Sequence, residues 1–159
     1  MGELEFGKNV DDIEAPVLIP EGWRTMRLLE EPKVEENKAM KEDPGLAEAG
    51  HNWRLDLETV DEEPMWSGRR FFLRFPLPRP SDMESYTSQG QKIYDAKMSR
   101  IVGFVEAFGG YISGNKASLG KGAIGQCYVL QQLNRLTQEP ENSIDIFNQG
   151  FKKAEIDPF

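Results

Sequence analysis

The clearest structural signal in the sequence is Trp53-Arg54-Leu55-Asp56-Leu57-Glu58-Thr59-Val60, which is followed after a short break by Arg69-Arg70-Phe71-Phe72-Leu73-Arg74-Phe75. In the first stretch apolar side chains alternate with charged ones, which is the period of a strand that has one face on a core. In the second stretch one face carries Phe71, Leu73 and Phe75, and the other carries Arg70, Phe72 and Arg74. Asp61-Glu62-Glu63-Pro64 and Gly68 separate the two stretches. We therefore predict an antiparallel pair of strands, Trp53–Val60 and Arg69–Phe75, joined by a loop.

The chain ahead of this pair divides into an arm, a strand and a connection. Residues 1–15 carry many acids and few large apolar groups, which predicts an arm without firm structure. A strand is expected at Trp23–Leu29, after a proline and a glycine. Residues 31–50 hold prolines, glycines and many charges, and indicate a long exposed connection with a short helix near Leu46–Ala49.

The chain behind the pair contains one long helix and two strands. Ser81 and Glu84 have the spacing of a capping box. A helix is predicted from Lys92 to Phe108, because apolar residues recur there at helical spacing: Tyr94, Met98, Ile101, Val105 and Phe108. Residues 109–125 contain six glycines and indicate a mobile loop. A strand is predicted at Gln126–Leu136, with Cys127, Val129 and Leu133 on one face and Tyr128 and Leu130 on the other. A turn at 139–142 separates it from a last strand at Ser143–Phe147.

The order of elements is therefore three strands, a helix and two strands. This order predicts a mainly β fold with one main helix. The simplest closed arrangement is a five-stranded barrel like the oligonucleotide-binding fold, with the helix after the third strand, because closing the sheet removes its exposed edges. A flat sheet with one packed helix fits the same order. We divide the chain into an acidic N-terminal arm at 1–15, a domain at 16–150 and a C-terminal tail at 151–159.

The charge is unevenly distributed. The 159 residues carry a net charge of −8, yet residues 1–63 sum to −11 and residues 64–154 to +5. Phosphate affinity comes from basic groups, so the second part is the one suited to nucleic acid. The N-terminus lacks a basic signal-peptide region and no apolar run is long enough to span a membrane, which predicts a cytoplasmic protein. Cys127 and His51 are each single, so we expect no disulfide, metal or cofactor.

An aromatic ring between two basic side chains is the most informative local pattern. Single-strand binders combine a positive groove with aromatic rings on which bases stack. The outward face of the second strand would carry Arg70, Phe72 and Arg74, and further contacts are expected from Lys116, Lys121 and Tyr128. In the alternative interpretation, Phe71 and Phe72 are both buried, one on each side of a covered sheet.

Catalytic patterns are weaker. The glycine-rich segment Gly114–Gly122 has five residues between its glycines and lacks the Ser or Thr after the lysine that a phosphate loop needs for magnesium. Asp56 and Glu58 share one strand face and are the neighbouring carboxylates that a metal-dependent nuclease would use. Since no nucleophile and base can be paired, we do not expect an enzyme.

Six short motifs resemble a family of bacteriophage single-stranded-DNA-binding proteins encoded among replication and recombination genes. They are Ile19-Pro20-Glu21-Gly22, Trp53–Leu57, Gly68-Arg69-Arg70, Phe108-Gly109, Gly120-Lys121 and Asn142-Ser143-Ile144-Asp145-Ile146-Phe147. The resemblance implies an oligonucleotide-binding barrel that binds single-stranded DNA without sequence preference during phage DNA replication or recombination. It leaves the DNA-versus-RNA preference and self-association open.

The chain ends Ala154-Glu155-Ile156-Asp157-Pro158-Phe159. This ending resembles the acidic tail of single-stranded-DNA-binding proteins, which finishes in Ile-Pro-Phe, although two lysines precede it here. The resemblance implies that Glu155, Ile156, Asp157, Pro158 and Phe159 recruit replication or recombination proteins. Two other functions stay open: an adaptor or inhibitor whose acidic half mimics nucleic acid, and the nuclease.

Overall fold

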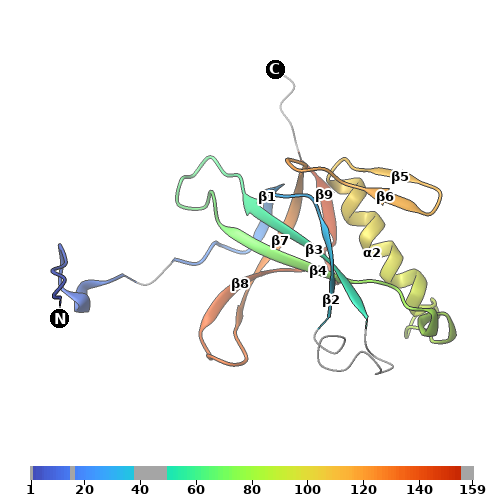
Figure 1. Cartoon of the computed structure of the whole chain (residues 1–159), viewed down its shortest axis with the longest axis horizontal. Coiled ribbons are helices and arrows are strands. Elements are labelled where there is room, and N and C mark those ends of the chain that lie inside the picture. The colour runs from blue at the N-terminus through green and yellow to red at the C-terminus, as the bar shows by residue number, and fades with distance from the viewer. Residues whose placement is uncertain (1, 15–16, 38–49, 155–159) are drawn as a thin grey trace, which may run out of the picture.

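The structure is a computed structural model that describes residues 2–14, 17–37 and 50–154 (Figure 1). Within these residues, the two 3-10 helices are η1 (Val10–Asp12) and η2 (Pro80–Glu84), and the one α-helix is α2 (Ile93–Ala107). The strands are β1 (Gly22–Leu28), β2 (Lys33–Glu36), β3 (His51–Thr59), β4 (Arg70–Pro76), β5 (Tyr111–Ser113), β6 (Lys116–Ser118), β7 (Ile124–Leu133), β8 (Pro140–Ile144) and β9 (Phe151–Lys153). The predicted mainly β fold with one main helix is confirmed.

Seven strands form one antiparallel sheet. Its path runs β2-β3-β1-β7-β8, with β4 paired to the other edge of β3 and β9 paired to β7 beside β8. Strands β5 and β6 form a separate hairpin. Among the described residues, the hydrogen-bonded path does not return from β8 or β9 to β4, so the sheet is not closed into a barrel. The predicted closed barrel is therefore not confirmed.

The two strands with the clearest sequence pattern, β3 and β4, pair over the whole length of β4. Strands β3 and β4 pair in antiparallel register from Asn52 opposite Pro76 to Glu58 opposite Arg70. The burial of β4 alternates strictly, with Phe71, Leu73 and Phe75 inward. Since each strand has one apolar face, a slip by one residue would expose the whole inward set, and this fixes the register.

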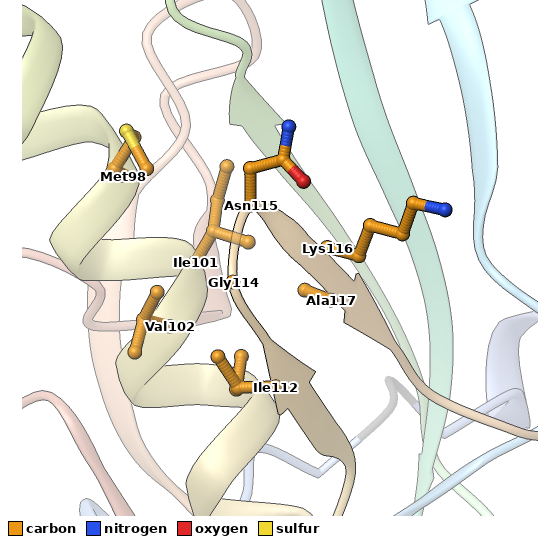
Figure 2. A pocket seen from close by; sticks show the side chains of 8 residues that line it. All are labelled: Met98, Ile101, Val102, Ile112, Gly114, Asn115, Lys116 and Ala117. Atoms are coloured by element: carbon orange, nitrogen blue, oxygen red, sulfur yellow. The ribbon is translucent and has the colours of Figure 1, made fainter.

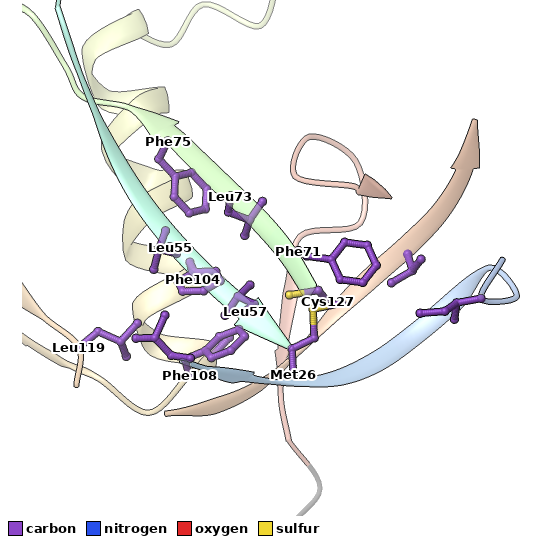
Figure 3. Close-up of a cluster of buried hydrophobic side chains, with 14 residues drawn as sticks. Met26, Leu55, Leu57, Phe71, Leu73, Phe75, Phe104, Phe108, Leu119 and Cys127 are labelled. Atoms are coloured by element: carbon purple, nitrogen blue, oxygen red, sulfur yellow. The ribbon is translucent and has the colours of Figure 1, made fainter. Parts of the chain in front are cut away.

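The core lies between the inward face of the sheet and helix α2 (Figure 3). Phe104 is fully buried and stacks on Phe108 at 4.2 Å between ring centroids, and it also meets Phe75 and Phe151 edge-on. Burying each such ring stabilises the fold by roughly 1.5–3 kcal/mol. The apolar residues predicted to face the core from this helix were partly wrong, because they omitted Phe104 and included Met98, which is 41% exposed.

Gly125 shows how closely the helix and the sheet approach each other. A Cβ atom built on Gly125 of β7 would lie 2.5 Å from the Phe108 ring. The neighbouring thiol of Cys127 is completely buried, and burial raises its pKa. This strand therefore presents only small side chains where α2 ends against it.

Two motifs that are far apart in the sequence meet at one end of the sheet. The side chain of Asn142 accepts a hydrogen bond from the backbone N–H of Ile19 at 2.8 Å and donates one to its carbonyl at 2.9 Å. Gln131 also donates to the Ile19 carbonyl, and Ile19 is itself buried. These bonds attach the segment before β1 to β7 and β8.

Several predicted boundaries were wrong. Lys33–Glu36, assigned to an exposed connection, is strand β2, and the helix proposed at Leu46–Ala49 lies outside the described residues. Residues 109–125 contain the β5–β6 hairpin, which Figure 1 shows beside α2. Leu133 is exposed at the end of β7. Pro140, assigned to a turn, begins β8, and Ile146 and Phe147 lie beyond its end.

Both ends of the chain also differ from the prediction. Residues 2–14 are exposed, as expected of an arm, but include the 3-10 turn η1. Phe151, assigned to the tail, opens β9 and packs on Phe104. The five residues from Glu155 to Phe159 lie outside the described residues.

The predicted capping box is displaced by two residues. Arg79, not Ser81, is the N-cap of η2, and its backbone N–H donates to the Asp82 carboxylate at 2.9 Å. Lys97 of α2 donates to the same carboxylate at 2.8 Å. Burial alone would raise the pKa of Asp82, but these hydrogen bonds and the charges of Lys97 and Arg79 hold it below its ordinary value. Asp82 therefore connects η2 to the helix.

Candidate nucleic-acid interface

The outward face of β3 and β4 carries the predicted aromatic-basic group. Arg70, Phe72 and Arg74 are exposed and alternate with the buried residues of β4. Phe72 is 55% exposed, whereas the neighbouring Phe71 is 9% exposed. The alternative interpretation, in which both rings are buried on a covered sheet, is therefore wrong.

Phe72 has a cation beside its ring that the sequence analysis did not include. Arg54 of β3 places its guanidinium carbon 4.9 Å from the centroid of the Phe72 ring. The Nε of Arg54 donates to Asp56 at 2.9 Å, and this bond holds the guanidinium over the ring. The hydrogen bond to Asp56 and the charges of Asp56 and Glu35 raise the pKa of Arg54, against the opposing effect of burial.

A carboxylate from β2 joins the two arginines of this face. Arg74 donates from Nε to Oε1 of Glu35 at 2.6 Å, while Nη1 of Arg54 lies 3.8 Å from Oε2. Each oxygen of the carboxylate thus faces a different guanidinium. The sequence analysis missed this contact because it treated Lys33–Glu36 as part of a connection.

Arg70 occupies a different environment from Arg54 and Arg74. It lies opposite Glu58 in the register, but Glu58 is paired with Arg27 of β1. Within the described residues, no ion pair or hydrogen bond is found for the Arg70 guanidinium. Arg70 and Phe72 line a hollow of about 200 Å³ together with Leu29, Glu30, Asp56 and Leu57. An exposed ring and a free cation therefore border the same depression.

The same outward face continues across β1 and β7. Trp23 lies opposite Tyr128, and the two rings pack edge to face at 5.5 Å. The ammonium of Lys152 on β9 lies 4.2 Å above the Trp23 ring. The strand register places Phe72 of β4 beside Asp56 of β3, and six residues along the strand direction separate that position from Trp23 of β1. This second aromatic-basic cluster is therefore offset from Phe72 by roughly 20 Å along the strands.

The two loop lysines that were predicted as site residues have different positions. Lys121 lines a shallow hollow with Arg27 and so borders the outward face. Lys116 lies on β6, at the rim of a hollow of about 170 Å³ between α2 and the β5–β6 hairpin (Figure 2). The floor of that hollow is apolar, with Met98, Ile101 and Ile112 among its lining residues. The structure thus brings Arg70, Phe72, Arg74, Tyr128 and Lys121 onto or beside one face, and leaves Lys116 on another surface.

The carboxylates considered for catalysis are held by arginines. Asp56 accepts from Arg54, and Glu58 pairs with Arg27. Among the residues that the structure describes, no three histidine, cysteine or carboxylate side chains gather as a metal ion would require. Across the same residues, no helix is both long and apolar enough to cross a membrane.

The chain was compared with known proteins. No protein-family model matches it, and a search of curated protein sequences found no similar protein.

Proposed function

We propose that the protein binds single-stranded DNA without sequence preference on the outward face of β4, β3, β1 and β7. The observation that carries the proposal is Phe72, an aromatic ring that is 55% exposed, has the Arg54 guanidinium over it and shares a hollow with Arg70. Every base has a π face, so a stacking ring accepts any sequence. Arginine on the same face supplies phosphate contacts, which position the strand without reading bases.

The second aromatic-basic cluster supports an extended ligand. Trp23, Tyr128 and Lys152 lie on the same face of the same sheet as Phe72. An offset of roughly 20 Å along the strand direction suits a strand of several nucleotides. A small ligand would engage one cluster and leave the other without a role.

The strand order is compatible with a partly open barrel of the oligonucleotide-binding type, which we propose as the finer description of the fold. The five strands of that fold would correspond, in chain order, to β1, β3, β4, β7 and the edge formed by β8 and β9. Helix α2 then lies between the third and the fourth strand. In that fold the face of the second and third strands binds oligonucleotides. Here those positions are β3 and β4, which carry Arg54, Phe72 and Arg74.

The biological setting of the proposal rests on the sequence resemblance. On that resemblance, the protein acts in phage DNA replication or recombination, and Glu155–Phe159 recruit partner proteins. Removing residues 155–159 is then expected to keep or tighten DNA binding while a replication or recombination partner is lost.

The test is the fluorescence anisotropy of a labelled oligo-dT titrated with the full chain at low and moderate salt, with duplex DNA as competitor. Binding that weakens as salt rises and that duplex cannot displace supports the proposal. An equal-length oligo-U measures the DNA-versus-RNA preference. Absence of binding at low salt would overturn the proposal and direct attention to the acidic adaptor. Magnesium-dependent loss of the oligonucleotide, abolished by Asp56→Asn, would instead indicate the nuclease.

A further inference from the structure

The carboxylate of Glu35 occupies a position suited to a phosphate. Its two oxygens face two guanidiniums, at 2.6 Å from Arg74 Nε and 3.8 Å from Arg54 Nη1. Arginine pairs recognise carboxylate and phosphate oxygens with the same donor geometry. The side chains of Arg54 and Glu35 are 31% and 25% exposed, and that of Arg74 is 49% exposed, so the three groups remain accessible from solvent.

We propose that Arg54 and Arg74 form a phosphodiester subsite beside Phe72, and that Glu35 of β2 fills this subsite in the free protein as a built-in competitor. The inference rests on the proposed function and assigns a ligand group to two residues of that face. Binding would exchange the Glu35 carboxylate for a backbone phosphate while the adjoining base stacks on Phe72.

The surroundings fix Arg54 in advance of any ligand. Asp56 accepts from the Nε of Arg54 at 2.9 Å, and the same guanidinium lies 4.9 Å from the Phe72 ring. Neither contact depends on Glu35. When the carboxylate leaves, Arg54 therefore keeps its position over the ring and can offer its outer nitrogens to the phosphate.

Strand β2 provides a matched control for the test. Glu36 is the next residue, carries the same charge and lies on the other side of the strand pleat from Glu35. Within the described residues, Glu36 has no ion pair. Glu35→Gln and Glu36→Gln therefore change the net charge equally and differ in the contact with Arg54 and Arg74.

The experiment measures oligo-dT affinity of the full-length variants at about 0.1 M salt, where charges separated by more than about 10 Å are largely screened. Glu35→Gln is expected to tighten binding by about threefold to tenfold, because two exposed ion pairs no longer compete. Glu36→Gln is expected to change the affinity by less than about twofold. In an Arg74→Gln background the gain from Glu35→Gln should shrink.

The outcomes separate the inference from the proposed function. Equal effects of the two glutamine variants, or weaker binding by Glu35→Gln, would overturn the subsite while leaving single-strand binding intact. If neither the unmodified protein nor any variant binds oligo-dT at low salt, the proposed function fails as well. Circular dichroism and thermal unfolding of each variant confirm that the sheet is retained.

Discussion

Replacing Phe72 with alanine removes the ring that carries the proposed function, and the structure sets the size of the effect. Base–aromatic stacking contributes roughly 1–3 kcal/mol per base, so the affinity for oligo-dT should fall roughly 5- to 150-fold. The ring is 55% exposed and makes one cation–π contact, with Arg54. That contact contributes about 0.5–1 kcal/mol and the covered part of the ring adds a comparable amount, so the free energy of unfolding should fall by no more than about 2 kcal/mol.

Phe71 gives the matched control, because it is the next residue on the same strand and points into the core. Phe71→Leu keeps an apolar side chain at this 9% exposed position and should lower the free energy of unfolding by about 1 kcal/mol. The affinity of the folded protein for oligo-dT should not change. The two variants therefore separate stacking from folding stability on one strand.

The assay pairs anisotropy titration of labelled oligo-dT with urea unfolding followed by circular dichroism. Phe72→Tyr keeps an aromatic face and should retain most of the affinity, which distinguishes stacking from a change in local packing. If Phe72→Ala binds oligo-dT as tightly as the unmodified protein, the assignment of this face to stacking is wrong. A loss of several kcal/mol of stability in Phe72→Ala would show that the ring belongs to the core.

The remaining predictions concern the fold. The pKa of Asp82 is lowered in the folded protein, so its contribution to stability is present above about pH 4 and is lost as pH falls further. Asp82→Asn should cost about 1–3 kcal/mol in urea unfolding at neutral pH and flatten the acid limb of the stability profile. Gly125→Ala should destabilise by about 1–3 kcal/mol, because its Cβ would lie 2.5 Å from the Phe108 ring. Gly103→Ala, on an open helix surface, should instead stabilise by about 0.5–1 kcal/mol, and equal thermal midpoints for these two variants would contradict the packing of α2 on β7.

The parts of the fold that could be predicted from sequence are those with a strong periodic pattern. Strands β3 and β4 alternate over seven or more residues, and α2 repeats apolar residues through four turns, so their bounds were predicted to within two residues. The outward position of Phe72 followed from the same alternation. In these segments the local pattern and the tertiary packing agree, which makes the prediction independent of distant partners.

The missed elements are short strands that depend on a partner. Strands β2, β5, β6 and β9 each have three or four residues, too few to show an alternation. Strand β9 exists through its pairing with β7, and its Phe151 packs on Phe104 of a helix more than forty residues earlier. Because β2 was missed, the position of Glu35 against Arg54 and Arg74 was missed as well. Contacts of this kind depend on register and not on composition.

Under the proposed function, a protein with a net charge of −8 binds a polyanion, and the positions of its acids limit how much charge contributes to that binding. Three arginines already pair with carboxylates, namely Arg54, Arg74 and Arg27. When a phosphate replaces such a carboxylate, the net charge at the site changes little, and few counterions condensed on the DNA are released. Arg70, which has no ion pair in the described part of the chain, contributes the full electrostatic gain. Each fully neutralised phosphate of a single strand gives a slope of about −0.7 in log affinity against log salt, so four arginines should together give a magnitude well below about 3. Under the proposed function, stacking on Phe72 and on the Trp23–Tyr128 pair is then expected to supply most of the affinity at physiological salt, so that rings contribute more than charge.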